Sequence, residues 1–222
     1  IYHGRIELVV SKLVAKGAEA SLYLEDWYGY QVIRKHRLPK PYRHPLLDTA
    51  IRNNRTIREA RLLAAARQAG VATPIIFMID LENATILMEF IKGRRVKELF
   101  PELTTKNRQA LFREIGSAVA KLHQHNIAHG DLTTSNLLLG NNGVIYFVDF
   151  GLATITQNVE DFGTDLHLLR RALSSTHYQH WQKTYGAFKK GYQSTYGKDA
   201  TVVFRKVAAI ESRGRYIVER IR

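Results

Sequence analysis

Two motifs constrain this chain more than any other feature: residues 129–136 read HGDLTTSN, and residues 148–151 read VDFG. Asn136 comes five residues after Asp131, and Asp149 comes thirteen residues after Asn136. Phosphoryl transfer needs a carboxylate that orients the attacking hydroxyl, and an amide oxygen and a second carboxylate that hold Mg²⁺ against a triphosphate. The motifs therefore predict phosphoryl transfer, with Asp131 as the catalytic aspartate and Asn136 and Asp149 as oxygen ligands of Mg²⁺.

A purely structural interpretation of these residues is the alternative. Asp131 could cap a helix, Asn136 could sit in a turn, and Asp149 could end an ordinary strand. The H-x-D-x-x-x-x-N string alone arises easily by chance, but an apolar strand ending in D-F-G at this distance makes the pair specific. His129 is expected to be a packed structural histidine, because no second His or Cys stands near it at a zinc spacing.

The composition describes a globular protein. The 222 residues are 45% hydrophobic and 24% charged, enough for one large domain or two small lobes with a sizeable core. Cysteine is absent, which excludes disulfides and thiolate chemistry. The sequence shows no long apolar run and no secretory leader, so we expect no membrane partner and a cytoplasmic location.

The formal net charge of +13 makes a polyanion such as tRNA an expected partner, although a generally basic surface is the simpler alternative. Two clusters of basic residues favour the polyanion. The first, between Arg34 and Arg58, comprises Arg34, Lys35, Arg37, Lys40, Arg43, Arg52, Arg55 and Arg58, with Asp48 as the acid opposing them. The second, Arg213 to Arg222, comprises Arg213, Arg215, Arg220 and Arg222 around Glu219.

The order of predicted elements indicates an α+β chain in two lobes. Short β-prone runs are expected at residues 6–10, 21–24, 30–34, 75–79 and 85–90, with one helix over about 49–69. A linker at 91–93 divides a β-rich N-lobe (1–91) from a mostly helical C-lobe (92–222). In the C-lobe we expect a helix from Thr104 or Thr105 to about residue 125, a hairpin with its turn at 141–143, and helices after 160.

Residues of the N-lobe are candidates for binding ATP. Lys35 ends a predicted strand and could reach the phosphates, and Glu59 on the following helix is its natural partner. Backbone groups of Glu89 and Ile91 could bond the adenine edge while Met88 shapes the back of the pocket. A hairpin turn carrying a single glycine could cover the phosphates; the residues assigned there are Val14, Ala15, Lys16, Gly17, Ala18, Glu19, Ala20 and Leu22.

Lys35, Glu59 and the two motifs resemble the protein-kinase superfamily. Five segments are similar, more narrowly, to the small atypical kinase subunit of the KEOPS (EKC) complex, which makes the threonylcarbamoyl modification of adenosine 37 in tRNA. These segments read GAEA at 17–20, YRHP at 42–45, RTIREAR at 55–61, HGDLTTSN at 129–136 and LSSTH at 173–177. The likeness runs from about Val14 to Arg215.

The resemblance implies a minimal bilobal protein-kinase-like fold that uses ATP and Mg²⁺, with Asp165 bracing the catalytic loop. It implies two protein partners, the threonylcarbamoyl-transferase subunit and a small subunit on the N-lobe. It also implies atypical Ser/Thr kinase activity together with tRNA-stimulated ATP hydrolysis. The basic C-terminal segment would lie near tRNA or the active site.

The chain departs from the pattern in two places. Residues 162–166 read FGTDL where relatives usually have KAVDL, and the tail has RGRY instead of a longer Arg-Lys run. Between Gly151 and Asp165 nothing resembles an activation loop ending in Ala-Pro-Glu, so an ordinary peptide-docking platform is not expected.

Three alternative functions stay open. A small-molecule phosphotransferase shares H-x-D-x-x-x-x-N, but it is expected to carry His-Pro-Gly where this chain has Thr133-Thr134-Ser135. A RIO-type ribosome-assembly kinase is similarly small, but that group usually lacks the glycine of D-F-G. A pseudokinase scaffold is disfavoured because the set Lys35, Glu59, Asp131, Asn136 and Asp149 is complete.

Overall fold

The computed structural model describes residues 11–219, with side chains up to residue 213. The chain divides into two compact units. The first ends at residue 91, and the second comprises the residues from 92 onward together with the stretch 65–73. The strand expected at 6–10 lies outside the described residues.

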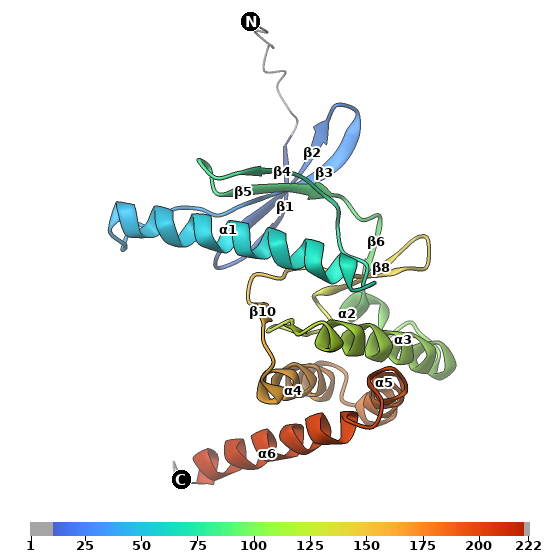
Figure 1. Cartoon of the computed structure of the whole chain (residues 1–222). Helices are drawn as coiled ribbons and strands as arrows, with labels where there is room; N and C mark the ends of the chain where they lie inside the picture. The colour runs from blue at the N-terminus through green and yellow to red at the C-terminus, as the bar shows by residue number, and fades with distance from the viewer. Residues whose placement is uncertain (1–10, 220–222) are drawn as a thin grey trace, which may run out of the picture. The chain divides into compact units, whose positions relative to one another are not determined.

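The first unit is a five-stranded antiparallel sheet in the order β1-β2-β3-β5-β4, and α1 lies along one of its faces (Figure 1). Its elements are β1 (Lys12–Lys16), β2 (Ser21–Trp27), β3 (Tyr30–His36), α1 (Pro45–Gln68), β4 (Ile76–Asp80) and β5 (Thr85–Glu89). The helix begins four residues before the expected position, because Pro45 fits the first turn, where its missing N–H has no helical partner to lose.

Strand register brings α1 onto the sheet. Ile33 pairs with Met88 and Lys35 pairs with Ile86, so these four residues share one face, as the two-residue period of strands requires. Met88 and Ile86 form a buried apolar cluster with Ala60 of α1, and Ile33 packs against it. This contact sets Glu59, the neighbour of Ala60, beside the strand that carries Lys35.

The second unit is mostly helical, so the predicted fold class is confirmed. Its helices are α2 (Val96–Leu99), α3 (Thr105–Gln124), α4 (Val159–Thr176), α5 (Trp181–Tyr196) and α6 (Ala200–Glu219). Its strands are β6 (Gly93–Arg95), β8 (Leu137–Gly140) and β9 (Ile145–Phe147) in one sheet, with β7 (Ile127–Ala128) paired to β10 (Thr154–Ile155). The expected cap of α3 is present, since the Thr104 hydroxyl accepts the Asn107 N–H at 3.2 Å.

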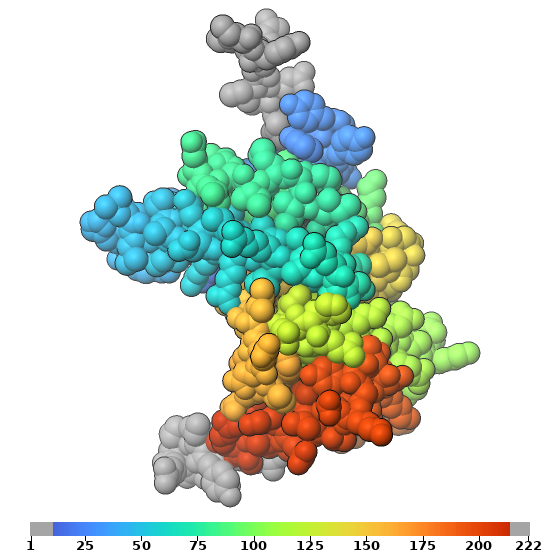
Figure 2. Space-filling view, in the orientation of Figure 1, coloured from blue at the N-terminus to red at the C-terminus, as the bar shows by residue number. Residues whose placement is uncertain are grey.

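Glycines let α3 and α5 pack backbone to backbone. A Cβ on Gly116 of α3 would overlap the carbonyl oxygen of Phe188, and one on Gly191 of α5 would overlap that of Arg113. Figure 2 shows the two helices in direct contact. The absence of side chains at these two glycines is therefore what allows the two helices to approach this closely.

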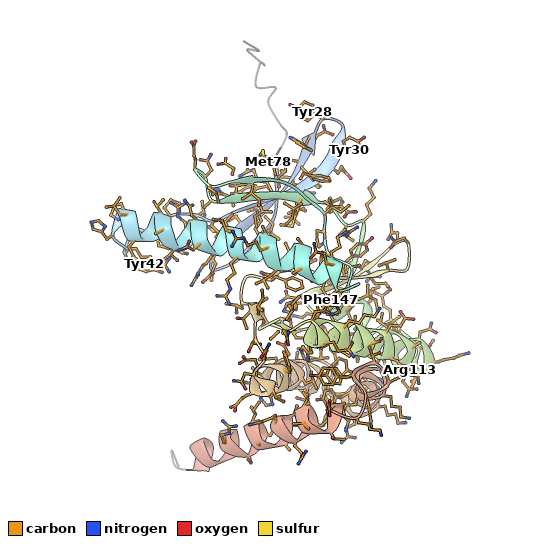
Figure 3. All side chains as sticks on the ribbon, in the orientation of Figure 1. Tyr28, Tyr30, Tyr42, Met78, Arg113 and Phe147 are labelled. Carbon is orange, nitrogen blue, oxygen red and sulfur yellow. The ribbon has the colours of Figure 1, made fainter. Side chains whose placement is uncertain are left out.

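The stretch 65–73 joins the second unit through main-chain bonding. The amide of Phe147, a fully buried residue labelled in Figure 3, donates to the carbonyl of Ala72 at 2.8 Å. The segment that follows α1 is thereby attached to the β8–β9 hairpin, which sequence reasoning did not anticipate. Among the described residues, no helix is both long enough and apolar enough to cross a membrane.

Candidate active site

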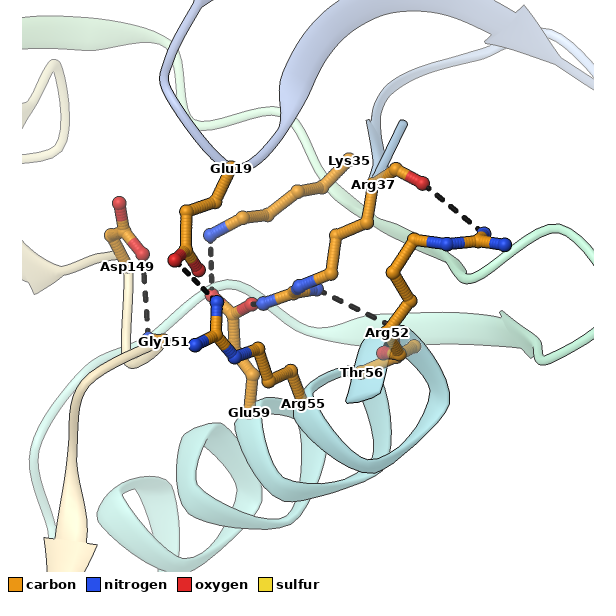
Figure 4. Close-up of polar contacts among 9 residues, drawn as sticks. All are labelled: Glu19, Lys35, Arg37, Arg52, Arg55, Thr56, Glu59, Asp149 and Gly151. Atoms are coloured by element: carbon orange, nitrogen blue, oxygen red, sulfur yellow. Dashed lines mark hydrogen bonds and ion pairs between the residues drawn. The ribbon is translucent and has the colours of Figure 1, made fainter. Parts of the chain in front are cut away.

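In the first unit, one buried carboxylate holds two cations (Figure 4). Lys35 Nζ donates to Glu59 Oε1 at 2.6 Å, and Arg37 Nη2 donates to Glu59 Oε2 at 2.5 Å. Lys35 is 6% exposed, Arg37 3% and Glu59 1%. The structure thus brings together Lys35 and Glu59, which the sequence paired, and adds an arginine that the sequence analysis had placed on the surface.

The turn between β1 and β2 is closed by one main-chain bond and attached to the rest of its unit at two points. Gly17 N–H donates to the Ala20 carbonyl at 2.9 Å, Lys40 Nζ donates to the Ala18 carbonyl at 2.6 Å, and Glu19 forms an ion pair with Arg55 of α1. Of the flanking candidates, Val14 and Lys16 are exposed, whereas Ala15 and Leu22 are partly buried. Their assignment to ATP stays a prediction.

Some of the hydrogen-bonding groups at the end of β5 are already used within the sheet. The amide of Glu89 donates to the carbonyl of Ile75 at 2.8 Å, and its carboxylate accepts the Ile75 N–H at 3.1 Å. The Glu89 carbonyl and the Ile91 amide are therefore the backbone groups that stay candidates for the adenine edge. Met88 is buried against α1 in a cluster with Ile86 and Ala60, and its role in an adenine pocket stays a prediction.

In the second unit, the β8–β9 hairpin brings the predicted metal ligands to one end. Leu137 pairs with Phe147, and one step beyond that pair the Val148 amide donates to the Asn136 carbonyl at 3.0 Å. Asn136, just before β8, and Asp149, shortly after β9, therefore both lie at the open end of the hairpin. The backbone of Asp149 has φ +62°, a left-handed conformation that is uncommon for aspartate and is typical of functional sites.

Asn136 also fixes the orientation of Asp131. Its side-chain Nδ2 donates to the Asp131 carbonyl and to Asp131 Oδ2, both at 2.9 Å. With its amide nitrogen used in this way, the Oδ1 atom of Asn136 is the one that can ligate a cation. In the described part of the chain, no group of three or more His, Cys, Asp or Glu is placed to hold a metal.

Asp165 in α4 holds the start of the loop through backbone amides. Its carboxylate accepts the N–H of His129 at 2.6 Å and the N–H of Gly130 at 2.7 Å. His123 of α3 contacts the same carboxylate through Nε2 at 3.2 Å, and its Nδ1 lies 2.9 Å from the hydroxyl of Tyr192. Asp165, His129, His123 and Tyr192 are buried and Gly130 is partly buried, which makes the loop anchor a property of the helical core.

Gly130 explains why glycine stands between His129 and Asp131. It has φ +77°, and a Cβ there would overlap the backbone carbonyl of Leu152, directly after D-F-G. The two motifs therefore lie against each other through main chain. His129 itself is fully buried, and burial lowers its pKa against the opposing effect of Asp165 and other nearby carboxylates, as expected for a packed neutral histidine.

The first basic cluster is not a free positive surface, which corrects its interpretation. Lys35 and Arg37 are buried, so neither side chain can contact tRNA as proposed. Several others are paired with acids: Arg34 with Glu25, Arg43 and Arg52 with Asp48, and Arg55 with Glu19. Counting charges along the sequence missed acids that other strands and turns contribute. In the second cluster, Arg213 pairs with Glu160 at 2.8 Å, and Arg215, Arg220 and Arg222 lie outside the described side chains.

Sequence reasoning missed three supporting residues: Arg37, His123 and His177. His177 caps α4, stacks on Phe100 at 3.8 Å between ring centroids and lies 3.4 Å from the hydroxyl of Thr134 in the catalytic loop. The alternation of Lys35 and Arg37 along β3 could have indicated that Arg37 faces α1. No local pattern marks the two histidines, because their partners come from distant segments.

Comparison with known families identifies a matching domain. Residues 43–179 match the model of the protein kinase domain, a span that includes Glu59, Asp131, Asn136, Asp149 and Asp165 but not Lys35. The β1–β2 turn with its single glycine also lies outside the matched span, in the part where the sequence departs from the usual kinase loop.

Individual relatives are more specific. The chain is 45% identical over 212 residues to the KEOPS complex subunit Bud32 of Pyrococcus abyssi, covering 92% of this chain and 96% of that protein. It is 37% identical to the EKC/KEOPS complex subunit bud32 of Dictyostelium discoideum, covering 91% and 82%. It is 39% identical to a probable bifunctional tRNA threonylcarbamoyladenosine biosynthesis protein of Methanobrevibacter smithii, of which it covers 36%. The chain therefore belongs to the protein-kinase superfamily and, within it, to the family of the KEOPS complex subunit Bud32.

Proposed function

We propose that this chain is an ATP- and Mg²⁺-dependent atypical Ser/Thr kinase and ATPase that works in a KEOPS-type complex and supports N6-threonylcarbamoylation of adenosine 37 in tRNA. One observation carries the proposal. The Lys35–Glu59 ion pair and the Asp131–Asn136 hydrogen bonds occur together on a chain that matches a KEOPS subunit over 96% of that subunit's length. A fold alone would not support it, because one fold hosts many functions.

Each residue has a defined part in this reaction. When bound, ATP supplies the phosphoryl group, and Mg²⁺ neutralises the negative charge of the phosphates. Lys35, held by Glu59, would donate to phosphate oxygens of the nucleotide. Asn136 Oδ1 and the Asp149 carboxylate would ligate the cation. Asp131, oriented by Asn136, would position the attacking hydroxyl or water, and such positioning accounts for much of the catalysis in phosphoryl transfer.

The donor set fits a hard cation. An amide oxygen and a carboxylate are the ligands that Mg²⁺ prefers, and two protein ligands leave coordination positions for phosphate oxygens and water. The hairpin that carries both residues is fixed by main-chain bonds at Leu137–Phe147 and at Asn136–Val148. This support favours a preorganised metal site.

The short connection after D-F-G favours ATP hydrolysis over phosphorylation of varied proteins. Only residues 152–158 separate Gly151 from the start of α4 at Val159, and β10 takes up two of them. A segment this short has no room for a peptide-docking loop. The bifunctional relatives, of which this chain covers about a third, support a role beside a second activity of the same modification pathway.

The partners follow from the family. We propose contact with the threonylcarbamoyl-transferase subunit and with a small subunit on the first unit. For tRNA we retain Lys40 and Arg58 of the first cluster as candidate contacts, together with the C-terminal segment from Arg213, because Arg43 and Arg55 are engaged by Asp48 and Glu19. Phosphate contacts by these side chains would make tRNA binding weaken steeply with salt.

The deciding experiment is ATP turnover by the isolated chain, with and without tRNA and the transferase subunit. We expect tRNA to stimulate turnover, and we expect Asp131→Ala and Asp149→Ala each to lower it by about 100-fold or more. Asp199→Ala, at an exposed carboxylate before α6, is the matched control and should behave like the wild type. Absence of stimulation, with Asp149→Ala equal to wild type, would overturn the proposal.

A second measurement separates chemistry from scaffolding. Cells carrying Asp131→Ala should lose threonylcarbamoyladenosine from their tRNA, measured by nucleoside mass spectrometry. Unchanged levels of the modified nucleoside would show that the chain acts as a scaffold. A parallel assay of phosphate transfer to protein Ser and Thr side chains measures the kinase part of the proposal.

A further inference from the structure

Arg37 has no part in the phosphotransfer reaction as described so far, yet it is one of the most deeply buried charged side chains in the first unit. Its guanidinium donates to Glu59 Oε2 at 2.5 Å through Nη2 and lies 3.4 Å from the hydroxyl of Thr56 through Nη1. Glu59 Oε1 is taken by Lys35 at 2.6 Å. The two oxygens of one carboxylate are thus divided between an arginine and the lysine (Figure 4).

Strand and helix periodicity place these groups together. Lys35 and Arg37 are two residues apart, so they project to the same side of the strand and its extension. Thr56 and Glu59 are three residues apart on α1 and share the helix face that meets the sheet. The pairing of Arg37 with Glu59 therefore follows from the same register that pairs Lys35 with Glu59.

The backbone N–H and the backbone carbonyl of Arg37 are both hydrogen-bonded. Its N–H donates to the Ala84 carbonyl at 3.1 Å, and its carbonyl accepts from Arg52 Nη1 at 3.4 Å. Arg52 is in turn held by Asp48 at 2.7 Å. The guanidinium consequently approaches Glu59 from a fixed anchor point rather than from a mobile loop.

The arginine is buried at a cost. Its Nε is buried with no hydrogen-bond partner among the described residues. A buried N–H that lacks a partner destabilises a fold, and a buried ion pair is often no more stabilising than an apolar residue of the same size. Stability alone is therefore a poor explanation for a charged side chain at this position.

We propose that Arg37 is a positioning residue for nucleotide binding, which acts through Glu59 on Lys35; the inference rests on the proposed use of ATP. By occupying Oε2, Arg37 restricts Lys35 to Oε1. The ammonium group has three N–H donors, and holding it to one carboxylate oxygen limits the share of them that Glu59 takes up when phosphate oxygens compete. Without Arg37, both carboxylate oxygens would compete for Lys35 and draw it away from the nucleotide.

The proposal predicts a change in nucleotide affinity more than in turnover. The Lys35–phosphate contact is formed in the bound ground state as well as in the transition state, so weakening it raises KM with little change in kcat. We expect Arg37→Gln to raise the KM for ATP by about tenfold and to lower kcat by less than about threefold. Arg37→Lys retains the cation on Glu59 and should keep KM within about threefold of wild type.

Arg108→Gln is the matched control. Arg108 is 4% exposed and donates to the carbonyls of Phe100 and Leu103 in the second unit, so its hydrogen bonds involve neither Lys35 nor Glu59. Its loss removes a buried guanidinium of similar environment and should lower stability without raising the KM for ATP. Far-UV circular dichroism and urea unfolding establish that each variant is folded at the assay temperature.

The outcomes separate this inference from the proposed function. If the wild-type chain neither binds nor hydrolyses ATP, the proposed function itself fails. If the wild type is active and Arg37→Gln has the KM of Arg108→Gln, the positioning role of Arg37 is wrong. A raised KM that Arg37→Lys does not restore would also overturn it, because the argument requires a cation on Glu59 Oε2.

If the variants do not fold, a structure of the wild-type chain tests the positioning role of Arg37. In a complex with Mg²⁺ and a nonhydrolysable ATP analogue, we expect Arg37 to stay on Glu59 Oε2 while Lys35 contacts phosphate oxygens. An Arg37 side chain that leaves Glu59 when the nucleotide is bound, or that itself contacts the phosphates, would contradict a positioning role.

Discussion

The two units hold their functional groups by different physical means. In the first, Lys35 is oriented by charge, through a carboxylate shared with Arg37. In the second, Asp131 and its loop are oriented by main chain, through two amides bound to Asp165 and through the contact of Gly130 with Leu152. The first arrangement therefore depends on paired side-chain charges. The second depends on backbone conformation and on the lack of space for a side chain at Gly130.

Replacing the shared carboxylate should have the largest effect. Glu59→Gln removes the negative charge that two buried cations share, and we expect a loss of about 3 to 5 kcal/mol in the free energy of unfolding. Glu25→Gln, which breaks the partly exposed pair with Arg34, should cost less than about 1 kcal/mol. Urea unfolding measures both. Equal losses of unfolding free energy in the two variants would contradict the comparison of the two units, because the buried charge pairing around Lys35 would then be worth no more than a partly exposed ion pair.

A methyl group should disturb the second unit almost as strongly. Gly130→Ala combines the cost of φ +77° with overlap on the Leu152 carbonyl, and we expect a loss of about 3 to 4 kcal/mol. Gly143→Ala is the matched control, since Gly143 has φ +78° but no atom within 4 Å of the position that a Cβ would take, so only about 1 kcal/mol of backbone strain is expected. If the two variants unfolded at the same urea concentration, close contact would not be the reason for Gly130.

The backbone anchor itself can be weakened without changing its size. Asp165→Asn replaces one of two accepting oxygens by an NH₂ group that faces an N–H donor, and we expect a loss of about 2 to 3 kcal/mol with a fall in kcat for ATP turnover. Asp161→Asn, at a half-buried carboxylate in the same helix that accepts the Thr156 hydroxyl, should leave kcat unchanged. A kcat for Asp165→Asn equal to that of the wild type would show that the loop holds its shape without this anchor.

The smallest expected effect is on pH dependence. Burial, together with Arg108 and Lys97, lowers the pKa of His177 from 6.5 to about 4. Between these values the unfolded chain binds the extra proton, so the stability that neutral His177 confers is fully present above pH 6.5 and is lost as pH falls toward 4. From pH 7 to pH 5 this amounts to about 2 kcal/mol.

The matched variant for this test is His177→Gln, which cannot titrate. Urea unfolding of wild type and variant at pH 7 and pH 5 isolates the contribution of the histidine from that of the carboxylates. The wild type should lose more stability on acidification than the variant does. Equal losses of unfolding free energy in wild type and variant would mean that protonation of buried His177 does not contribute to the pH dependence.

Much of the fold was predictable because its signals are local. Alternation in β2 and β3, the cap at Thr104 and the turn at 141–143 each depend on neighbouring residues, and the structure has the corresponding elements. The start of α1 at Pro45 was missed because a proline can either interrupt or begin a helix, and only the surrounding structure decides which. The attachment of residues 65–73 to Phe147 depends on a contact across more than seventy positions and has no local signal.

The amino-acid sequence by itself determined the chemistry available: an aspartate, an asparagine and a second aspartate at kinase spacing, with a lysine and a glutamate upstream. Tertiary structure decided which charges serve that chemistry. Arg37 and Lys35 are near neighbours in a basic run, yet both are buried on Glu59, while other members of the run pair with Asp48, Glu25 and Glu19. Periodicity tells which way a side chain faces, but its partner depends on strand register and helix placement, which only the folded chain establishes.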